Sequence, residues 1–142
     1  MTDGTNRRLM FHGMLLFLLG LFTGFAEQHF ANVRMGLAAH LEGVMNGTFL
    51  VAVGAIWPHV NLSPRTTAFA FWALLYGTYM NWSMTMLAAI FGTGALSPIT
   101  APGRSGLPWQ EGLVTAGFMS VGITIVIASL LVLWGLRKEV SR

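Results

Sequence analysis

Three polar side chains lie close together in a segment that is otherwise hydrophobic. Residues 38–47, AAHLEGVMNG, contain His40, Glu42 and Asn46. An imidazole binds metals and transfers protons, a carboxylate pairs with cations, and a carboxamide donates and accepts hydrogen bonds. Polar and ionisable groups inside a membrane span are costly, and they usually face a bundle interior, a cavity or a cofactor. This segment is therefore the first candidate for a functional site.

Glycines share one face of the predicted helix with the histidine. Gly36, His40, Gly43 and Gly47 follow i, i+4, i+7, i+11 spacing, which places them within about 60° of one another. In one interpretation, the glycines permit close packing on another helix and His40 forms a hydrogen bond across the contact. In the other, the three glycines bind the face of a flat cofactor and His40 ligates its metal. Haem suits the second interpretation, because it needs an axial imidazole and room for a planar macrocycle.

Other polar residues flank this face or occupy the third predicted helix. Asn46 lies roughly 90° to one side of the glycine face, where it either reaches a pocket or forms an interhelical hydrogen bond. Glu42 lies well off the face, toward a neighbouring helix or subunit. Thr78, Asn81 and Thr85 form a polar ridge at i, i+3, i+7. Helices with polar or small inward faces can together enclose a cavity.

The composition predicts a membrane setting for these residues. Of 142 residues, 54% are hydrophobic and 9% are charged, and the mean hydropathy is +0.64. Soluble domains carry about 25% charged residues, so we predict an integral membrane protein whose main partner is the lipid bilayer. The basic residues form no patch, so no nucleic acid is expected. Without cysteine, disulfides, iron–sulfur clusters and covalently attached haem are excluded.

We predict a single all-α membrane domain over residues 1–142, built as a four-transmembrane-helix bundle. Crossing about 30 Å of hydrocarbon takes roughly 20 helical residues. Four apolar stretches are long enough, at residues 9–28, 35–57, 67–91 and 111–136. The proline- and glycine-rich loop 92–110 joins the last two, and we expect it to be either disordered or folded over the bundle as a lid or rim.

The basic residues predict the orientation. One side of the predicted membrane carries six of them and the other carries two, Arg34 and Arg104. By the positive-inside rule, both termini are therefore expected in the cytoplasm, with the protein in a bacterial-type inner membrane. The six residues on the cytoplasmic side are Arg7, Arg8, Arg65, Arg137, Lys138 and Arg142.

Two blocks of sequence resemble a known family. They are HGMLLFLLGLFTG in the first span and RMGLAAHLEGVMNGTFLVAVG in the second. Both look like the hydroxylaminobenzene mutases and, more distantly, the styrene oxide isomerases. The resemblance covers most of the chain, from about His12 into the fourth span. Its most specific part is the histidine six residues before an Asn-Gly pair.

The resemblance implies an isomerase that needs no net redox partner. Hydroxylaminobenzene mutases convert arylhydroxylamines to aminophenols, and styrene oxide isomerases convert aryl epoxides to aldehydes. The isomerase relatives are four-helix proteins that form trimers and hold haem b at subunit boundaries. A homotrimer acting on a small aromatic substrate is therefore expected here. The iron ligand of the relatives corresponds to His40, their catalytic asparagine to Asn46, and a further asparagine to Asn81.

One departure from the family pattern bears on the substrate. The isomerases carry a catalytic tyrosine four residues after the second asparagine, where this chain has Thr85. Threonine is too short to replace a phenol, which favours the hydroxylamine reaction over epoxide isomerisation. In the mechanism we predict, ferric haem on His40 weakens the N–O bond as a Lewis acid. Asn46 bonds the substrate heteroatom, and Asn81 and Thr85 line the pocket. A non-enzymatic membrane haem protein is the remaining alternative.

Overall fold

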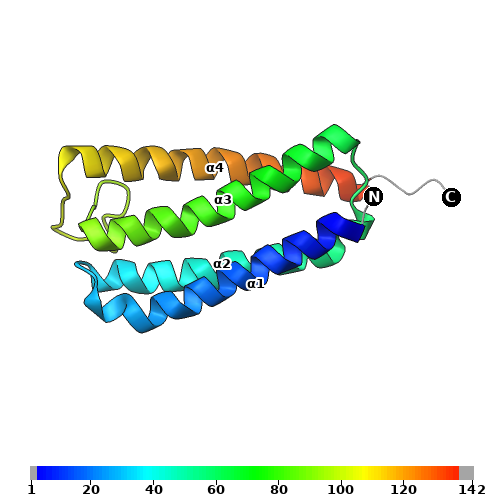
Figure 1. The fold of residues 1–142 in the computed structure, drawn as a ribbon. Coiled ribbons are helices and arrows are strands. Elements are labelled where there is room, and N and C mark those ends of the chain that lie inside the picture. The colour runs from blue at the N-terminus through cyan, green and yellow to red at the C-terminus, as the bar shows by residue number, and fades with distance from the viewer. Residues whose placement is uncertain (1–2, 138–142) are drawn as a thin grey trace.

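The computed structural model describes residues 3–137, and all its regular secondary structure is helical. Four long helices lie side by side (Figure 1). Two short 3-10 helices, η1 and η2, follow the first two long helices. The prediction of an all-α fold is confirmed for this range. The long helices are α1, Asp3–Ala26; α2, Val33–Ile56; α3, Pro64–Phe91; and α4, Pro108–Arg137, and the short ones are η1, Glu27–His29, and η2, Trp57–His59.

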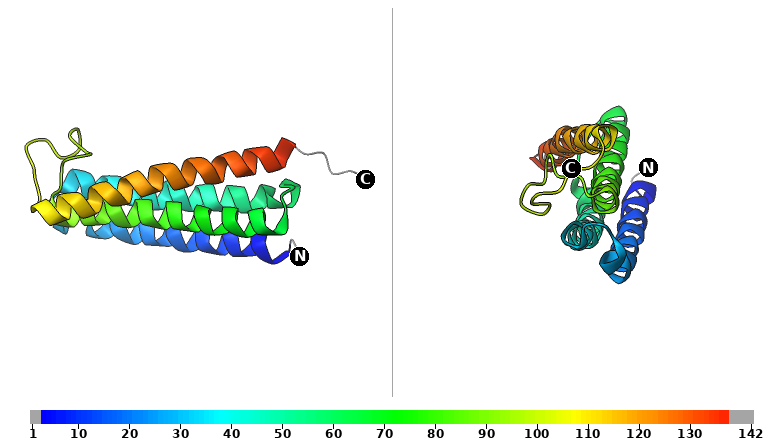
Figure 2. Two further views of the ribbon diagram at one scale, coloured as in Figure 1. Left: turned by 90° about the horizontal axis from the view of Figure 1, so that it is seen from above. Right: turned by 90° about the vertical axis from the view of Figure 1, so that its left-hand side faces the viewer.

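The long helices form two pairs that pack together. α1 packs along α2, α3 packs along α4, and α2 and α3 join the two pairs. The start of α1 and the end of α4 lie at the same end of the bundle, and the loop between α3 and α4 lies at the opposite end (Figures 1 and 2). Polar groups on the α2 face that meets α3 are therefore shielded by α3.

Capping residues set where the helices begin. Asn32 caps α2 and Ser63 caps α3, each accepting a backbone N–H three residues further on. Pro64 follows Ser63 at the first helical position, and Gly92 ends α3 in the left-handed conformation, with φ of 70°. Each helix begins two to six residues before its predicted span. This difference arises because hydrophobicity marks the hydrocarbon boundary, whereas caps mark the end of the helix.

Within residues 3–137, three helices are long and apolar enough to cross a membrane. The candidate spans are Gly4–His29, Val33–His59 and Pro108–Arg137. With 28 residues, α3 is also long enough, but its tyrosines, threonines and asparagine lower its hydropathy. α4 exposes large apolar side chains along its length, among them Ile123, Val126 and Leu130. These properties fit an integral membrane protein.

The loop between α3 and α4 is folded against the end of the bundle. It spans residues 92–107, because α4 begins at Pro108. The Glu111 carboxylate accepts three backbone N–H groups of the loop at 2.8, 3.0 and 3.1 Å. Asn32 Nδ2 donates to the loop carbonyl of Thr100 at 3.1 Å. The described loop is thus folded against the bundle, and its role as a lid or rim stays a prediction.

Buried apolar side chains form two clusters separated along the bundle. One cluster, toward the end where α1 begins, includes Leu16, Leu50 and Leu74. The other, toward the loop, includes Met35 and Ala88. The polar residues of α2 and α3 lie between these clusters. A polar site can therefore form in mid-bundle, where the apolar core is interrupted.

Candidate active site

A carboxylate and two carboxamides form a hydrogen-bonded cluster between α2 and α3. Glu42 Oε2 accepts a hydrogen bond from Asn46 Nδ2 at 2.9 Å, one turn further along α2. The same oxygen accepts a second bond from Asn81 Nδ2 of α3 at 2.6 Å. All three side chains are half-buried. The structure thus brings the two predicted catalytic asparagines together, and the Glu42 carboxylate joins them.

The threonines of the predicted polar ridge bond to their own helix. Thr85 is 3% exposed and its hydroxyl donates to the backbone oxygen of Asn81 at 2.8 Å. Thr78 is fully buried and donates to the backbone oxygen of Leu74 at 2.7 Å. A hydroxyl that bonds the carbonyl one turn back has used its only donor. In this conformation the Thr85 hydroxyl could only accept a hydrogen bond from a substrate. A direct contact between Thr85 and substrate stays a prediction.

His40 points from α2 toward α1. Its Nδ1 lies 2.7 Å from the backbone oxygen of Gly20, and its ring packs against Gly24. A carbonyl oxygen only accepts hydrogen bonds, so Nδ1 must carry the proton. In the neutral ring, the lone pair is then on Nε2. Metal-binding histidines commonly show this arrangement, in which one nitrogen bonds the backbone and the other faces the metal.

Gly43 and Gly47 of α2 face α1 in a close helix contact. A Cβ on Gly47 would lie 2.5 Å from the backbone nitrogen of Phe17, and a Cβ on Gly43 would collide with the backbone of Gly20. One on Gly36 would lie 2.8 Å from the Phe30 ring. Packing thus covers all three glycines that we predicted to lie beside a cofactor, Gly43 and Gly47 through α1 and Gly36 through Glu27 and Phe30. This contact leaves no space for a flat ligand, so a cofactor bound by His40 must lie outside it.

His40 and the asparagine cluster lie on opposite faces of α2. His40 bonds α1, whereas Glu42 bonds α3. Two positions along an α-helix correspond to a rotation of about 200°, which accounts for this separation. A single chain therefore does not assemble the predicted iron ligand and the predicted catalytic asparagines into one pocket.

A shallow apolar groove adjoins His40 on the outside of α1 and α2. Its volume is about 290 Å³, and its lining is mostly apolar, with one carboxylate beside the imidazole: Leu21, Gly24, Phe25, Leu37, Glu27 and His40. No described residue bonds His40 Nε2, and every buried side-chain nitrogen or oxygen of the described chain has a partner, so Nε2 is accessible from the groove. Ligand pockets usually measure about 300–1,000 Å³. The groove thus offers an imidazole nitrogen but does not by itself enclose a large cofactor.

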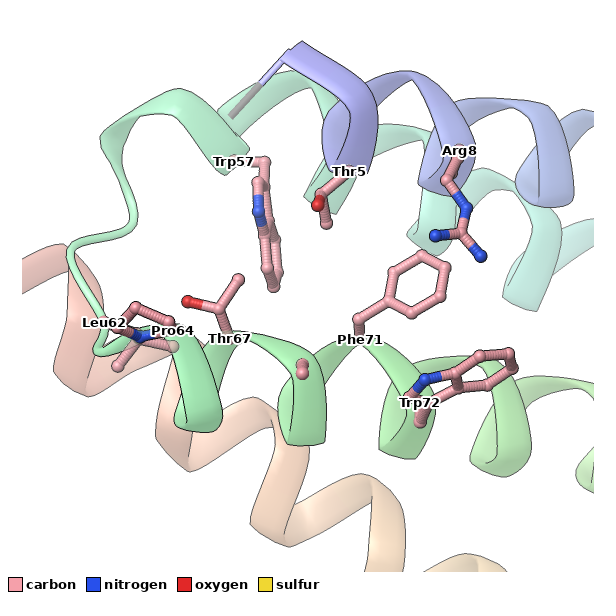
Figure 3. A pocket seen from close by; sticks show the side chains of 9 residues that line it. Thr5, Arg8, Trp57, Leu62, Pro64, Thr67, Phe71 and Trp72 are labelled. Atoms are coloured by element: carbon pink, nitrogen blue, oxygen red, sulfur yellow. The ribbon is translucent and has the colours of Figure 1, made fainter. Parts of the chain in front are cut away.

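A second cavity lies between the start of α1 and the start of α3 (Figure 3). Its volume is about 330 Å³, and its lining includes Arg8, Trp57, Phe71 and Trp72. The Arg8 guanidinium carbon lies 4.6 Å from the centre of the Phe71 ring, a cation–π contact. Trp57 is only 2% exposed, so it is a core residue, although its position near a helix end suggests an interfacial one. No predicted site residue lines this cavity.

Sequence reasoning left Glu42 without a role, although one signal was present. Glu42 and Asn46 are four residues apart, a spacing at which helical side chains meet. Their side chains do form a hydrogen bond. The contact with Asn81 had no such signal, because it depends on α3 packing on this particular face of α2.

Comparison with known proteins gives matches over nearly the whole chain. The model of the styrene oxide isomerase family matches residues 5–137. Hydroxylaminobenzene mutase HabB of Ectopseudomonas oleovorans is 45% identical over 137 residues, which cover 96% of this chain and 84% of the relative. Hydroxylaminobenzene mutase HabA of the same organism is 40% identical over 127 residues, which cover 89% and 94% of the two chains. No solved structure matches.

Proposed function

The chain belongs to the styrene oxide isomerase family, and we propose that it converts arylhydroxylamines of the hydroxylaminobenzene type to aminophenols. The observation that carries this proposal is the 45% identity, over 96% of the chain, to a protein named hydroxylaminobenzene mutase. Because both curated relatives are named as mutases, the chain is an isomerase. The alternative of a non-enzymatic haem protein is therefore not pursued.

Isomerisation of an aryl epoxide to an aldehyde is the second candidate reaction, favoured by the name of the family model. One experiment separates the two. Purified protein in detergent is incubated in parallel with hydroxylaminobenzene and with styrene oxide, and the products are identified by mass spectrometry. We expect aminophenol from the first substrate. A protein that leaves hydroxylaminobenzene unchanged while forming phenylacetaldehyde would reverse the assignment.

We further propose that all four long helices span the bilayer with both termini in the cytoplasm. Three of the helices are apolar enough on their own, and α3 lies between α2 and α4, so it would enter the membrane with them. Its polar side chains face partners inside the bundle, as in the Thr78 and Asn81 hydrogen bonds. A helix whose polar groups are satisfied internally can cross a membrane at a lower average hydropathy.

We propose that His40 binds haem b through Nε2. The support is the position of the Nδ1 proton, the accessible Nε2 and the apolar walls of the groove. Iron held there would act as a Lewis acid toward the hydroxylamine oxygen. The chain itself positions the substrate, with Asn46 and Asn81 bonding its polar atoms. The apolar surroundings exclude the water that would otherwise capture a cationic intermediate.

A homotrimer would bring the separated parts of the site together. Within one chain His40 bonds α1, whereas Asn46 bonds Glu42 on the side of α2 that meets α3, and the groove beside His40 is too small to enclose a macrocycle. We propose that a neighbouring copy covers the groove of each chain and supplies its Asn46 and Asn81 to that site. The large apolar side chains exposed on α2, Leu37, Leu41 and Met45, would be covered in such an assembly.

Replacing Asn46 with alanine should preserve haem binding but slow turnover about 10²-fold, as for other oriented hydrogen bonds that act in a transition state. Absorption spectra and initial rates measure the two effects. Thr48→Ala, an exposed position on the same helix whose hydroxyl bonds only the Val44 backbone, is the control and should change neither.

A site that combines His40 of one chain with Asn46 of its neighbour can be tested by mixing two variants. Protein made by co-expressing Asn46→Ala and His40→Ala chains should be clearly more active than either variant alone, because some sites in mixed trimers would contain neither substitution. Co-expressed chains that form mixed oligomers but recover no activity would argue that each chain carries its own complete site.

A further inference from the structure

The Glu42 cluster has a defined hydrogen-bond polarity. Glu42 Oε2 receives the amide groups of both Asn46 and Asn81. In both bonds the amide nitrogen is the donor and Oε2 is the acceptor, because a carboxyl oxygen that carries no proton can only accept, so each carboxamide turns its NH₂ end toward Glu42. Within residues 3–137, no basic side chain pairs with Glu42. The carboxylate therefore fixes the orientation of both asparagines.

This orientation turns the two carboxamide oxygens away from Glu42. Neither Oδ1 atom, nor Glu42 Oε1, has a hydrogen-bond partner among the described residues. Because no buried side-chain nitrogen or oxygen of residues 3–137 lacks a partner, these three oxygens are not fully buried. A ligand that approaches the cluster therefore meets several acceptors whose lone pairs are unused.

We propose that Glu42 is a positioning residue that sets substrate specificity through these two asparagines. By holding their NH₂ ends, it presents their carbonyl oxygens to the N–H and O–H donors of an arylhydroxylamine. An aryl epoxide carries a single polar atom, an acceptor, and would leave those oxygens unpaired. This inference rests on the proposed function, because it explains how that site would prefer a hydroxylamine to an epoxide.

The expected discrimination is large. A site built to bond a substrate hydroxyl or amine rejects an analogue that lacks the group by up to about 10⁴-fold, because its polar groups are then desolvated without a partner. A purely structural role for Glu42, as a link between α2 and α3, makes a different prediction. Loss of Glu42 would then loosen the helix contact and weaken the binding of both kinds of ligand to a similar degree.

Glu42→Gln separates these roles in the full-length protein. Glutamine has nearly the same shape but both donates and accepts, so the two carboxamides can rotate and present their NH₂ ends. We expect kcat/KM for hydroxylaminobenzene to fall about 10²-fold, with styrene oxide inhibiting at least as tightly as in the wild type. Glu42→Asp keeps the acceptor and should recover part of the discrimination. Thr48→Val, on the same helix, is the matched control and should leave both constants unchanged.

A second measurement needs no variant, which covers the case in which Glu42→Gln does not fold. Aniline and toluene have the same shape, but only aniline carries N–H donors. Aniline should inhibit the wild-type protein at least about 10-fold more strongly than toluene. Equal inhibition by the two compounds would overturn the assignment of Glu42.

The outcomes also separate this inference from the proposed function. A wild-type protein that does not isomerise hydroxylaminobenzene contradicts the proposed function itself. If the wild type is active, and Glu42→Gln lowers kcat/KM for hydroxylaminobenzene and weakens inhibition by styrene oxide by the same factor, the proposed function stands. Glu42 is then only a structural link. A shift in the ratio of the two constants supports the specificity role.

Discussion

Replacing His40 with alanine should remove the Soret absorbance of the purified protein and lower its isomerase rate by at least about 10³-fold, which corresponds to roughly 4 kcal/mol of transition-state stabilisation. Within residues 3–137, no group of three His, Cys, Asp or Glu side chains could hold a bare metal ion. A single imidazole with one accessible nitrogen instead suits a metal that arrives inside a cofactor. Loss of this ligand should therefore remove metal and activity together.

His12 provides the control, because it is another histidine within a candidate span. Its Nδ1 lies 3.2 Å from the Tyr79 hydroxyl on α3, so it does not lie in the groove beside His40. His12→Ala should keep the Soret band. In His40→Gly, added imidazole should restore the band, because the free ligand can fill the space left by the side chain. A wild-type protein that is fully active and colourless would contradict the haem proposal.

The helices could be predicted from the sequence because their signals are local. Apolar stretches of more than about 20 residues indicate spans, and each lies inside one of the long helices apart from a residue or two at its end. The pairing of helices has no local signal. The glycines of α2 indicate a face with small side chains, but spacing alone does not show that this face and α1 meet. The structure shows that they do, with Gly20 against Gly43.

The candidate site was predictable only in part for the same reason. Helical spacing predicted that His40 and Asn46 point in different directions from one helix, and the family resemblance assigned their roles. The role of Glu42 depends on a contact with Asn81, which is 39 residues away in the chain. That contact exists because α3 packs on one face of α2, and hydrophobic periodicity does not distinguish this face from its neighbours. The proposed completion of the pocket by a second copy also has no local signal in the sequence of one chain.

Replacing Gly43 with alanine should destabilise the protein by about 1–3 kcal/mol, the usual cost of overpacking. The added methyl group would meet the backbone of Gly20, which cannot move by changing a side-chain rotamer. Alanine is the better helix former by about 0.5–1 kcal/mol, so the net loss must come from the contact between α1 and α2. The same contact holds His40 Nδ1 against the backbone oxygen of Gly20, so haem content should fall as well.

Gly122→Ala is the matched control, because it adds the same methyl group to α4, where no atom lies within 4 Å of the new Cβ. Unfolding by SDS, followed by circular dichroism, should show Gly43→Ala unfolding at lower SDS and Gly122→Ala at an equal or higher concentration than the wild type. The Soret band of Gly122→Ala should be unchanged. A Gly43→Ala protein as stable as the wild type would mean that α1 and α2 do not meet through their glycines. The proposed placement of the haem ligand would then lose its support, because the bond that orients His40 depends on that close approach.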